Sequence, residues 1–233
     1  MTLESILTNF LESYMQGCFF CMPALVINVK DSEQLRVDVK PLVKRVYKDG
    51  TEHEYAPLLS VPCITPSTSN SALVLPVKHG DTVLLMFSQQ NIEQFKAGTT
   101  TPHTPTSGRW LDINDAVAIV GLNPFNLSPN LKTRHVLPHN PEDAVLVHNL
   151  GTQKECEVRL GSDGSVSINK QRQHLIVSEA GIIATSGASS ISITDGLINM
   201  TSPLVMVNGV NINTHLHSYT DDGVPSLTSP PVV

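Results

Sequence analysis

The chain begins with a stretch of helical periodicity. Within residues 2–14 apolar side chains recur at intervals of three and four, with Thr2 placed as an N-cap and Glu4 in the first turn. This spacing puts the apolar side chains on one side of a helix. The sequence therefore predicts an N-terminal amphipathic helix within 1–20. Its apolar stripe requires a partner, either the following domain or a neighbouring subunit.

From residue 21 to residue 122 the periodicity changes to short alternating runs that are typical of strands. Polar stretches, among them KDG at 48–50 and KHGD at 78–81, separate these runs. Five or six strands within about 100 residues suit a small closed barrel such as an OB-fold better than a large sandwich. The runs expected to form strands are ALVINV, LRVDV, VKRVY, SALVLPV, TVLLMF and AVAIV.

Prolines interrupt the alternation in residues 123–153, which we interpret as a Pro-rich linker or extended arm. Three histidines, His135, His139 and His148, lie in this segment at irregular spacing. We expect them to be solvated loop residues rather than metal ligands.

Short strands return in residues 154–212, each closed by Gly, Asp, Asn or Ser. Strands this short and rich in small residues cannot bury a core alone, and their edges would be open to uncontrolled pairing. We therefore expect three chains to share them as an intertwined trimeric β-helix or β-prism with an axial apolar core. The turn glycines form a loose repeat: Gly164, Gly181, Gly196 and Gly209.

Composition narrows the function classes. The chain of 233 residues is 40% hydrophobic and 15% charged, with a formal net charge of -6. This balance offers no electrostatic footprint for a phosphate backbone, so we expect no nucleic-acid partner. The start has no basic region typical of a secretory signal, and no apolar run approaches the ~20 residues of a membrane-spanning helix. No lysine or arginine follows Arg172.

The four cysteines include one C-x-x-C pair, formed by Cys18 and Cys21. A structural zinc site needs a second ligand pair, and a redox motif should open a helix in a βαβ setting, which this pattern does not show. The other two cysteines are Cys63 and Cys156. We expect all four to be small buried hydrophobic residues in a reducing compartment.

His215 and His217, in the C-terminal segment 213–233, are candidate metal ligands. Residues two apart in a strand point to one side, so three chains around a threefold axis would stack two rings of three imidazoles. Zinc prefers four tetrahedral ligands, so a six-imidazole site favours iron, cobalt or nickel. Without an open coordination position the ion would be structural. The alternative is a pair of exposed surface histidines.

The phase of the last strand conflicts with this ligand set. If Ile212 faces the common axis, strict alternation turns both histidines outward. The metal hypothesis therefore requires a bend or bulge between Ile212 and His215, and Asn213 or Thr214 is the expected place.

Five strings follow one another along the chain: MPALVINVKDSEQLRVDVKP, LVLPVKHGDTVLLMFSQQNIEQF, WLDINDAVAIVGLNP, EVRLGSDGSVSI and THLHS. Together they resemble the central spike, or membrane-piercing tail-tip, proteins of contractile-tailed bacteriophages. The resemblance implies an N-terminal OB-fold barrel that leads to a homotrimeric β-helix. It also implies a tip that holds one iron ion per trimer through His215 and His217 of each chain.

The function that the resemblance implies is mechanical. The trimer would sit at the tail baseplate tip of the virion, after synthesis in the host bacterial cytoplasm, and contact baseplate hub or tail-tube proteins. Tail contraction would drive it through the host outer membrane. The resemblance implies no catalytic residue and no small-molecule substrate, so we expect the protein not to be an enzyme.

Two rival functions stay open. A metalloenzyme could use His215, His217 and Asp221 or Asp222, but G-x-S-x-G, H-E-x-x-H and P-loop strings do not occur in the sequence. A trimeric receptor-binding tail fibre or adhesin predicts a larger, aromatic-bearing terminal domain than 218–233, in which Tyr219 is the sole aromatic residue.

Overall fold

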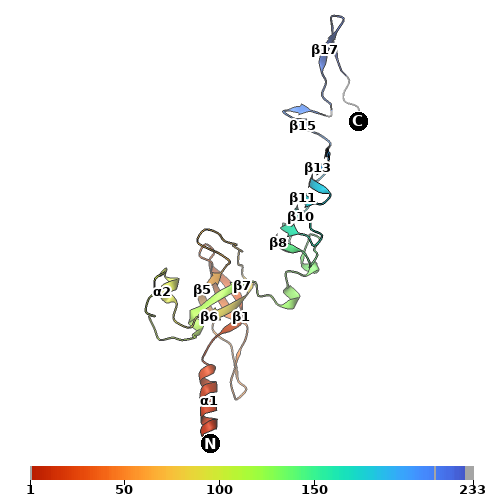
Figure 1. The fold of residues 1–233 in the computed structure, drawn as a ribbon. Helices are drawn as coiled ribbons and strands as arrows, with labels where there is room; N and C mark the ends of the chain where they lie inside the picture. Colours follow the sequence, from red (N-terminus) through yellow and green to blue (C-terminus); the bar gives the residue numbers. More distant parts are fainter. Residues whose placement is uncertain (1, 213, 229–233) are drawn as a thin grey trace. The chain divides into compact units, whose positions relative to one another are not determined.

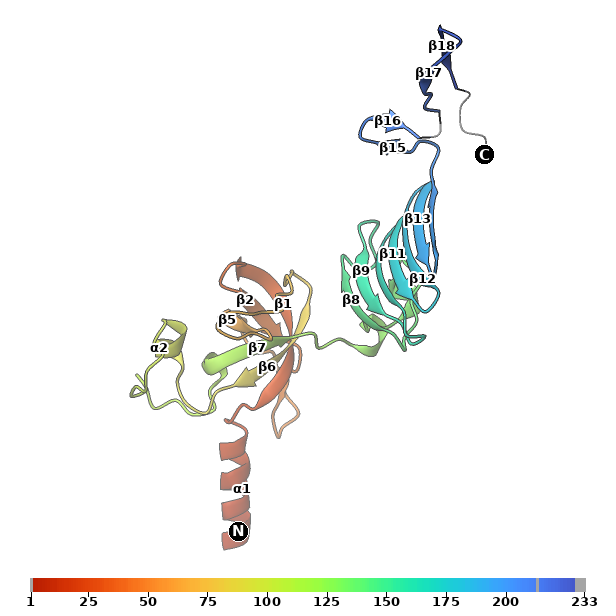
Figure 2. The same cartoon turned by 45° about the horizontal axis from the view of Figure 1, so that its top comes forward.

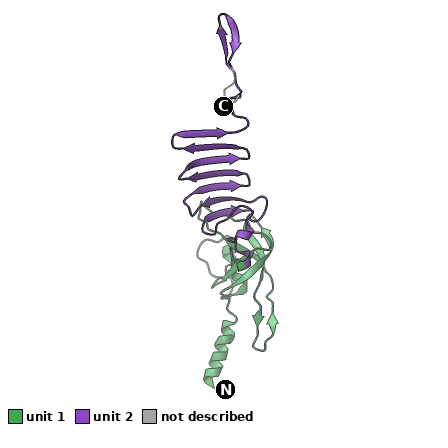
Figure 3. Cartoon of the chain, turned by 90° about the vertical axis from the view of Figure 1, so that its right-hand side faces the viewer, with its two compact units in different colours: residues 1–125 green, residues 126–233 purple. Residues whose placement is uncertain are grey.

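The computed structural model describes residues 2–212 and 214–228, with the side chain of Asp221 also outside the description. The chain divides into two compact units, Met1–Phe125 and Asn126–Val233 (Figure 3). Both units are built mainly of β-strands, as the sequence pattern predicts. Among the described residues, no helix has the length and apolarity needed to cross a membrane.

The N-terminal amphipathic helix is confirmed as α1, Leu3–Met15 (Figure 1). The Thr2 hydroxyl accepts a hydrogen bond from the backbone N–H of Ser5 at 3.3 Å, which caps the first turn. No residue of α1 is buried, and Phe10 is 65% exposed. The apolar stripe is therefore uncovered in the single chain. Lys48 reaches the helix through an ion pair with Glu12 at 2.9 Å.

The first unit contains the expected small closed barrel (Figure 2), in which the strand order is β1-β2-β5-β7-β6. All neighbouring strands are antiparallel except β5 and β7, which are parallel. Alternating side chains fill the interior, with Val26, Val39 and Leu85 fully buried. The barrel strands are β1 (Cys21–Asp31), β2 (Arg36–Pro41), β5 (Leu58–Ile64), β6 (Thr82–Phe87) and β7 (Ala116–Val120).

The other elements of the first unit lie outside the barrel. They are the short hairpin of β3 (Arg45–Val46) and β4 (Glu52–His53), the helix α2 (Glu93–Lys96) and the 3-10 helices η1 (Ile113–Asp115) and η2 (Phe125–Leu127), the last of which spans the division between the units.

Two runs predicted as barrel strands lie outside the barrel, and one barrel strand was not predicted. VKRVY, residues 43–47, contributes only the two-residue strand β3 of a separate hairpin. SALVLPV, residues 71–77, makes only an isolated bridge between Ala72 and Ser67, and Val74 is 60% exposed. Its Pro76 has no N–H to donate to a ladder. β5 takes its place in the barrel, although Pro62 interrupts its pattern.

The cysteines differ from expectation. None of the four forms a disulfide, and none is fully buried. Cys21 is exposed at the start of β1, where the expectation of burial is wrong, and the other three are only half-buried. Cys63 is half-buried and packs against the barrel core. Burial raises the pKa of its thiol, which keeps it neutral.

The second unit is dominated by a seven-stranded antiparallel sheet in which the strands follow one another in chain order (Figure 3). Two small hairpins follow it, β15–β16 and β17–β18. The sheet strands are β8 (Ala144–His148), β9 (Cys156–Leu160), β10 (Val166–Lys170), β11 (Gln173–Ser178), β12 (Gly181–Ser186), β13 (Ser189–Thr194) and β14 (Leu197–Thr201). The hairpin strands are β15 (Met206–Val207), β16 (Val210–Asn211), β17 (Ser218–Asp221) and β18 (Val224–Leu227).

Residues 123–153, which we interpreted as a linker, contain regular structure. β8 is the edge strand of the seven-stranded sheet, and a 3-10 helix, η3 (Lys132–Arg134), precedes it.

Candidate functional site

One face of the seven-stranded sheet is apolar from β8 to β14. Residues two apart in a strand share a face, so two adjacent rows of cross-strand partners lie on the same side of the sheet. The first row is Ala144, Leu160, Val166, Val177, Ile182, Ile193 and Ile198, and the second row is Leu146, Val158, Ile168, Leu175, Ala184, Ile191 and Met200. We call this surface the apolar face.

The apolar face is open to solvent in the single chain. Among the larger side chains of these rows, exposure reaches from 40% for Leu175 to 68% for Ile198. Monomeric soluble proteins rarely expose a continuous apolar surface this long, and such surfaces mark interaction sites. The opposite face carries polar side chains in several of the same strands, including Glu157, Asn169 and Ser192. The chain itself covers part of this opposite face, since Glu157 is 3% exposed, and leaves the apolar face open.

The two predicted ligands at the C-terminal end, His215 and His217, lie close together. Their ring centroids are 4.9 Å apart, with an interplanar angle of 84°. Nδ1 of His215 lies 2.8 Å from the carbonyl oxygen of Ile212. A carbonyl oxygen can only accept a hydrogen bond, so Nδ1 carries the hydrogen and donates it. This tautomer leaves Nε2 with its lone pair available for a metal ion. The backbone N–H of His217 donates to the Thr228 hydroxyl at 3.0 Å.

The chain turns between the last apolar strand and these histidines. β16 ends at Asn211, the N–H of Ile212 donates to the carbonyl of Val205 at 2.9 Å, and Thr214 lies in a turn. Asn213, one of the two predicted bend positions, lies outside the described residues. Ile212 and Thr214 are both turn residues, so the strand does not continue to the histidines, and a turn here is what the metal hypothesis requires.

His135 and His139 differ from expectation, because their imidazoles are not solvated. The rings stack with centroids 3.7 Å apart and an interplanar angle of 5°, and the His135 side chain is 1% exposed. Nε2 of His135 donates to the Pro129 carbonyl at 2.8 Å, and Nε2 of His139 donates to the Asn130 side-chain oxygen at 2.9 Å. Nδ1 of each ring is buried without a hydrogen-bond partner.

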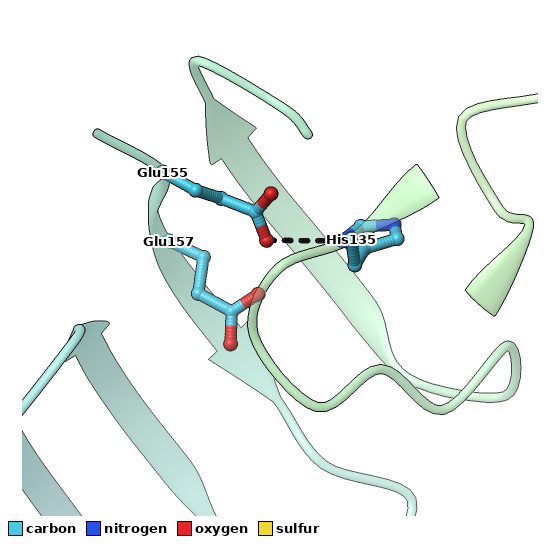
Figure 4. A group of neighbouring side chains, drawn as sticks. All are labelled: His135, Glu155 and Glu157. Carbon is cyan, nitrogen blue, oxygen red and sulfur yellow. Dashed lines mark ion pairs between the residues drawn. The ribbon is translucent and has the colours of Figure 1, made fainter. Parts of the chain in front are cut away.

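A buried carboxylate faces His135. Oε1 of Glu155 lies 3.5 Å from Nδ1 of His135, and the two side chains point toward one another (Figure 4). The Glu155 carboxylate also accepts backbone N–H groups from Val136 at 3.0 Å, Leu137 at 3.1 Å and Gly151 at 2.7 Å. Burial by itself raises the pKa of Glu155, but these three donors outweigh it and hold the pKa below its ordinary value. The carboxylate is therefore charged.

A second carboxylate completes this cluster. Glu157 follows Glu155 on the chain, and one potential ligand atom from each of His135, Glu155 and Glu157 lies within 4.8 Å of the others. Arg159 donates to both Glu157 oxygens at 3.0 Å, and Asn169 donates to Oε1 at 2.9 Å. Sequence reasoning missed this cluster because the prolines around His135 indicated an exposed arm. The signal in the sequence is the spacing of Glu155, Glu157 and Arg159, which are two residues apart and so can share one face of an extended strand.

Comparison with known proteins connects the barrel to phages. Residues 22–121 match the family model described as the Phage protein Gp138 N-terminal domain. The matched residues contain almost all of β1 and the remaining barrel strands, and they are less than half of the chain. No curated protein matches the chain. The match supports a phage structural protein of the tail or baseplate type.

Proposed function

We propose that this chain is the central spike of a contractile phage tail, a homotrimer at the baseplate tip that pierces the host outer membrane when the tail contracts. The observation that carries the proposal is the uncovered apolar face. The proposed function of the protein is mechanical, and it involves no catalysis and no small-molecule substrate.

The apolar face favours assembly because burying it removes a large hydrophobic surface from water. Each Å² of apolar surface buried contributes about 25 cal/mol, and the two rows extend across all seven strands. Three copies with their apolar faces turned toward a common axis would form a β-prism or β-helix with this surface as its core. A dimer would also cover the face, but it would bring four tip imidazoles together instead of six.

The tip histidines fit the metal that the proposal requires. His215 and His217 of three chains supply six imidazole nitrogens, and the hydrogen bond from His215 to Ile212 fixes the tautomer that leaves Nε2 free. Such an all-nitrogen set suits iron, cobalt or nickel, of which we propose one iron ion per trimer. The ion would join three chain ends where β15 and β16 offer only two residues of pairing each.

The barrel would serve as the base of the spike. We assign it as an OB-fold, because its strand order places the third strand beside the fifth in a small closed Greek-key barrel. We propose that it contacts baseplate hub or tail-tube proteins. The exposed stripe of α1 offers these proteins an additional apolar surface.

A trimeric receptor-binding fibre is the alternative that an infection experiment separates from the spike. Phage particles assembled with His215→Ala and His217→Ala should adsorb to cells normally. Because the tip loses its metal, they should pierce the outer membrane at least tenfold less efficiently, measured as the release of a host periplasmic enzyme into the medium. Particles carrying His79→Ala and His103→Ala, which change two exposed imidazoles of the first unit, are the matched control. Loss of adsorption with normal penetration of adsorbed particles would contradict the spike and favour the fibre.

A further inference from the structure

We propose that His135, Glu155 and Glu157 form a second metal site, buried within each chain, that binds one divalent transition-metal ion of the zinc class. This site is separate from the histidine tip. It needs no partner chain, since all three ligands belong to one chain.

The first observation is an unpartnered nitrogen. His135 donates its Nε2 hydrogen to the Pro129 carbonyl, so in the neutral ring Nδ1 carries a lone pair. That atom is buried, has no hydrogen-bond partner and faces Glu155 (Figure 4). A buried acceptor without a partner is unfavourable. A metal ion would relieve this cost.

Both carboxylates keep acceptor capacity. Oε1 of Glu155 accepts one backbone N–H, from Leu137, and Oε2 of Glu157 accepts one N–H, from Arg159. Each oxygen has two lone pairs, so one stays free on each. In a tetrahedral zinc site, ligands about 2.0–2.1 Å from the ion lie roughly 3.3 Å from one another. The 3.5 Å from Nδ1 of His135 to Oε1 of Glu155 is close to this spacing.

The charges of the cluster also require a cation. Glu157 and Asp143 both pair with the guanidinium of Arg159, while Glu155 lies against His135. The side chains of Glu155, Glu157, Asp143 and Arg159 are 1%, 1%, 7% and 12% exposed. With neutral His135 the cluster carries a net charge of minus two by this count, which a divalent ion balances. A protonated His135 would balance only one charge. Buried charges without compensation are strongly unfavourable.

Groups around the ligands hold them in place. Arg159 and Asn169 orient Glu157, while Arg159 itself is anchored by Asp143 at 2.9 Å. Such outer hydrogen bonds usually tune metal affinity by 10–100-fold. One nitrogen and two oxygens form a harder ligand set than six imidazoles, so this site and the tip would select different metals.

The test uses the full chain with His215→Ala and His217→Ala, so that the tip contributes no ligand. Equilibrium dialysis against Zn²⁺ should give one ion per chain. His135→Phe keeps a ring but removes the lone pair, and it should weaken Zn²⁺ binding at least tenfold. His139→Phe is the matched control, because it changes the stacked, equally hidden imidazole outside the ligand set, and it should bind Zn²⁺ as before.

Co²⁺ provides a readout that requires no change in the cluster, so a His135→Phe chain that fails to fold does not prevent a decision. Co²⁺ added to the tip-less chain should produce the intense visible absorption of tetrahedral coordination, and Zn²⁺ should abolish it. No Zn²⁺ bound by the tip-less chain, or equal loss in both Phe variants, would overturn the proposal.

Discussion

Ile191 and Ser192 are neighbours on β13, yet they lie on opposite faces of the seven-stranded sheet. Ile191 pairs with Met200 in the apolar face and is 44% exposed, whereas Ser192 pairs with Asn199 on the other face and is half-buried. The single chain thus exposes the isoleucine more than the serine. This inversion of the usual burial supports the proposal that further copies of the chain cover the apolar face.

Ile191→Asp should prevent trimer formation, because three unpaired carboxylates would be buried at the common axis, each at a cost of several kcal/mol. Size-exclusion chromatography with light scattering measures the result. Ser192→Asp introduces the same charge one residue away, on the polar face, and should leave the trimer intact. Equal behaviour of the two variants would contradict the orientation of the sheet.

His215→Ala with His217→Ala should remove iron from the protein but leave the trimer, because the apolar faces and not the metal hold the chains together. Elemental mass spectrometry gives the iron content, and light scattering gives the mass of the same sample. A double variant that ran as a monomer would show that the metal holds the assembly.

Gly181→Ala should destabilise the sheet by about 3 kcal/mol or more. Gly181 has φ of +127°, and an added Cβ would lie 2.2 Å from the Ile193 carbonyl oxygen. Gly196 also has positive φ, +76°, but an added Cβ there meets nothing within 4 Å. Gly196→Ala should therefore cost only about 1–2 kcal/mol. Thermal denaturation of both variants checks the difference, and equal losses would exclude the steric cause.

Asp38 should make the barrel sensitive to acid. Its carboxylate accepts the N–H of Ser60 at 2.9 Å and the amide of Asn28 at 3.0 Å, and these hydrogen bonds hold its pKa below the ordinary value of 3.8. The unfolded chain then binds the proton at higher pH than the folded chain. The stability from Asp38 is present above pH 3.8 and is lost as pH falls through the lowered pKa.

Asp38→Asn tests this dependence, because asparagine does not titrate but can still accept the N–H of Ser60. The variant should start less stable at neutral pH and lose less stability than the original chain on acidification to about pH 3. Urea unfolding followed at several pH values measures both. Parallel losses in the two proteins would assign the acid sensitivity to other groups.

Alternation along the chain was enough to predict most of the barrel. β1, β2, β6 and β7 each place apolar residues on one face, and the sequence identified them. β5 escaped because Pro62 breaks its pattern and Ser60 adopts positive φ, 56°, which the buried Asp38 supports through the hydrogen bond to its N–H. A run of apolar residues such as SALVLPV does not show whether a neighbouring strand is available to pair with it.

The polar cluster of the second unit was beyond sequence reasoning. His135 and Glu155 are brought together by the fold of the intervening chain, and composition alone favoured an exposed Pro-rich arm. The apolar rows were predicted in kind but not in detail, since their register appears only once the strands are paired. The metal ligands His215 and His217 stay a prediction.

The mass of this chain in solution, measured by light scattering, tests the central claim most directly. The account predicts the mass of three chains of 25.3 kDa each. The trimer should persist at low protein concentration and at high salt, because salt does not screen an apolar contact. A single chain of 25.3 kDa under the same conditions would contradict it, because the apolar face would then be stable in water.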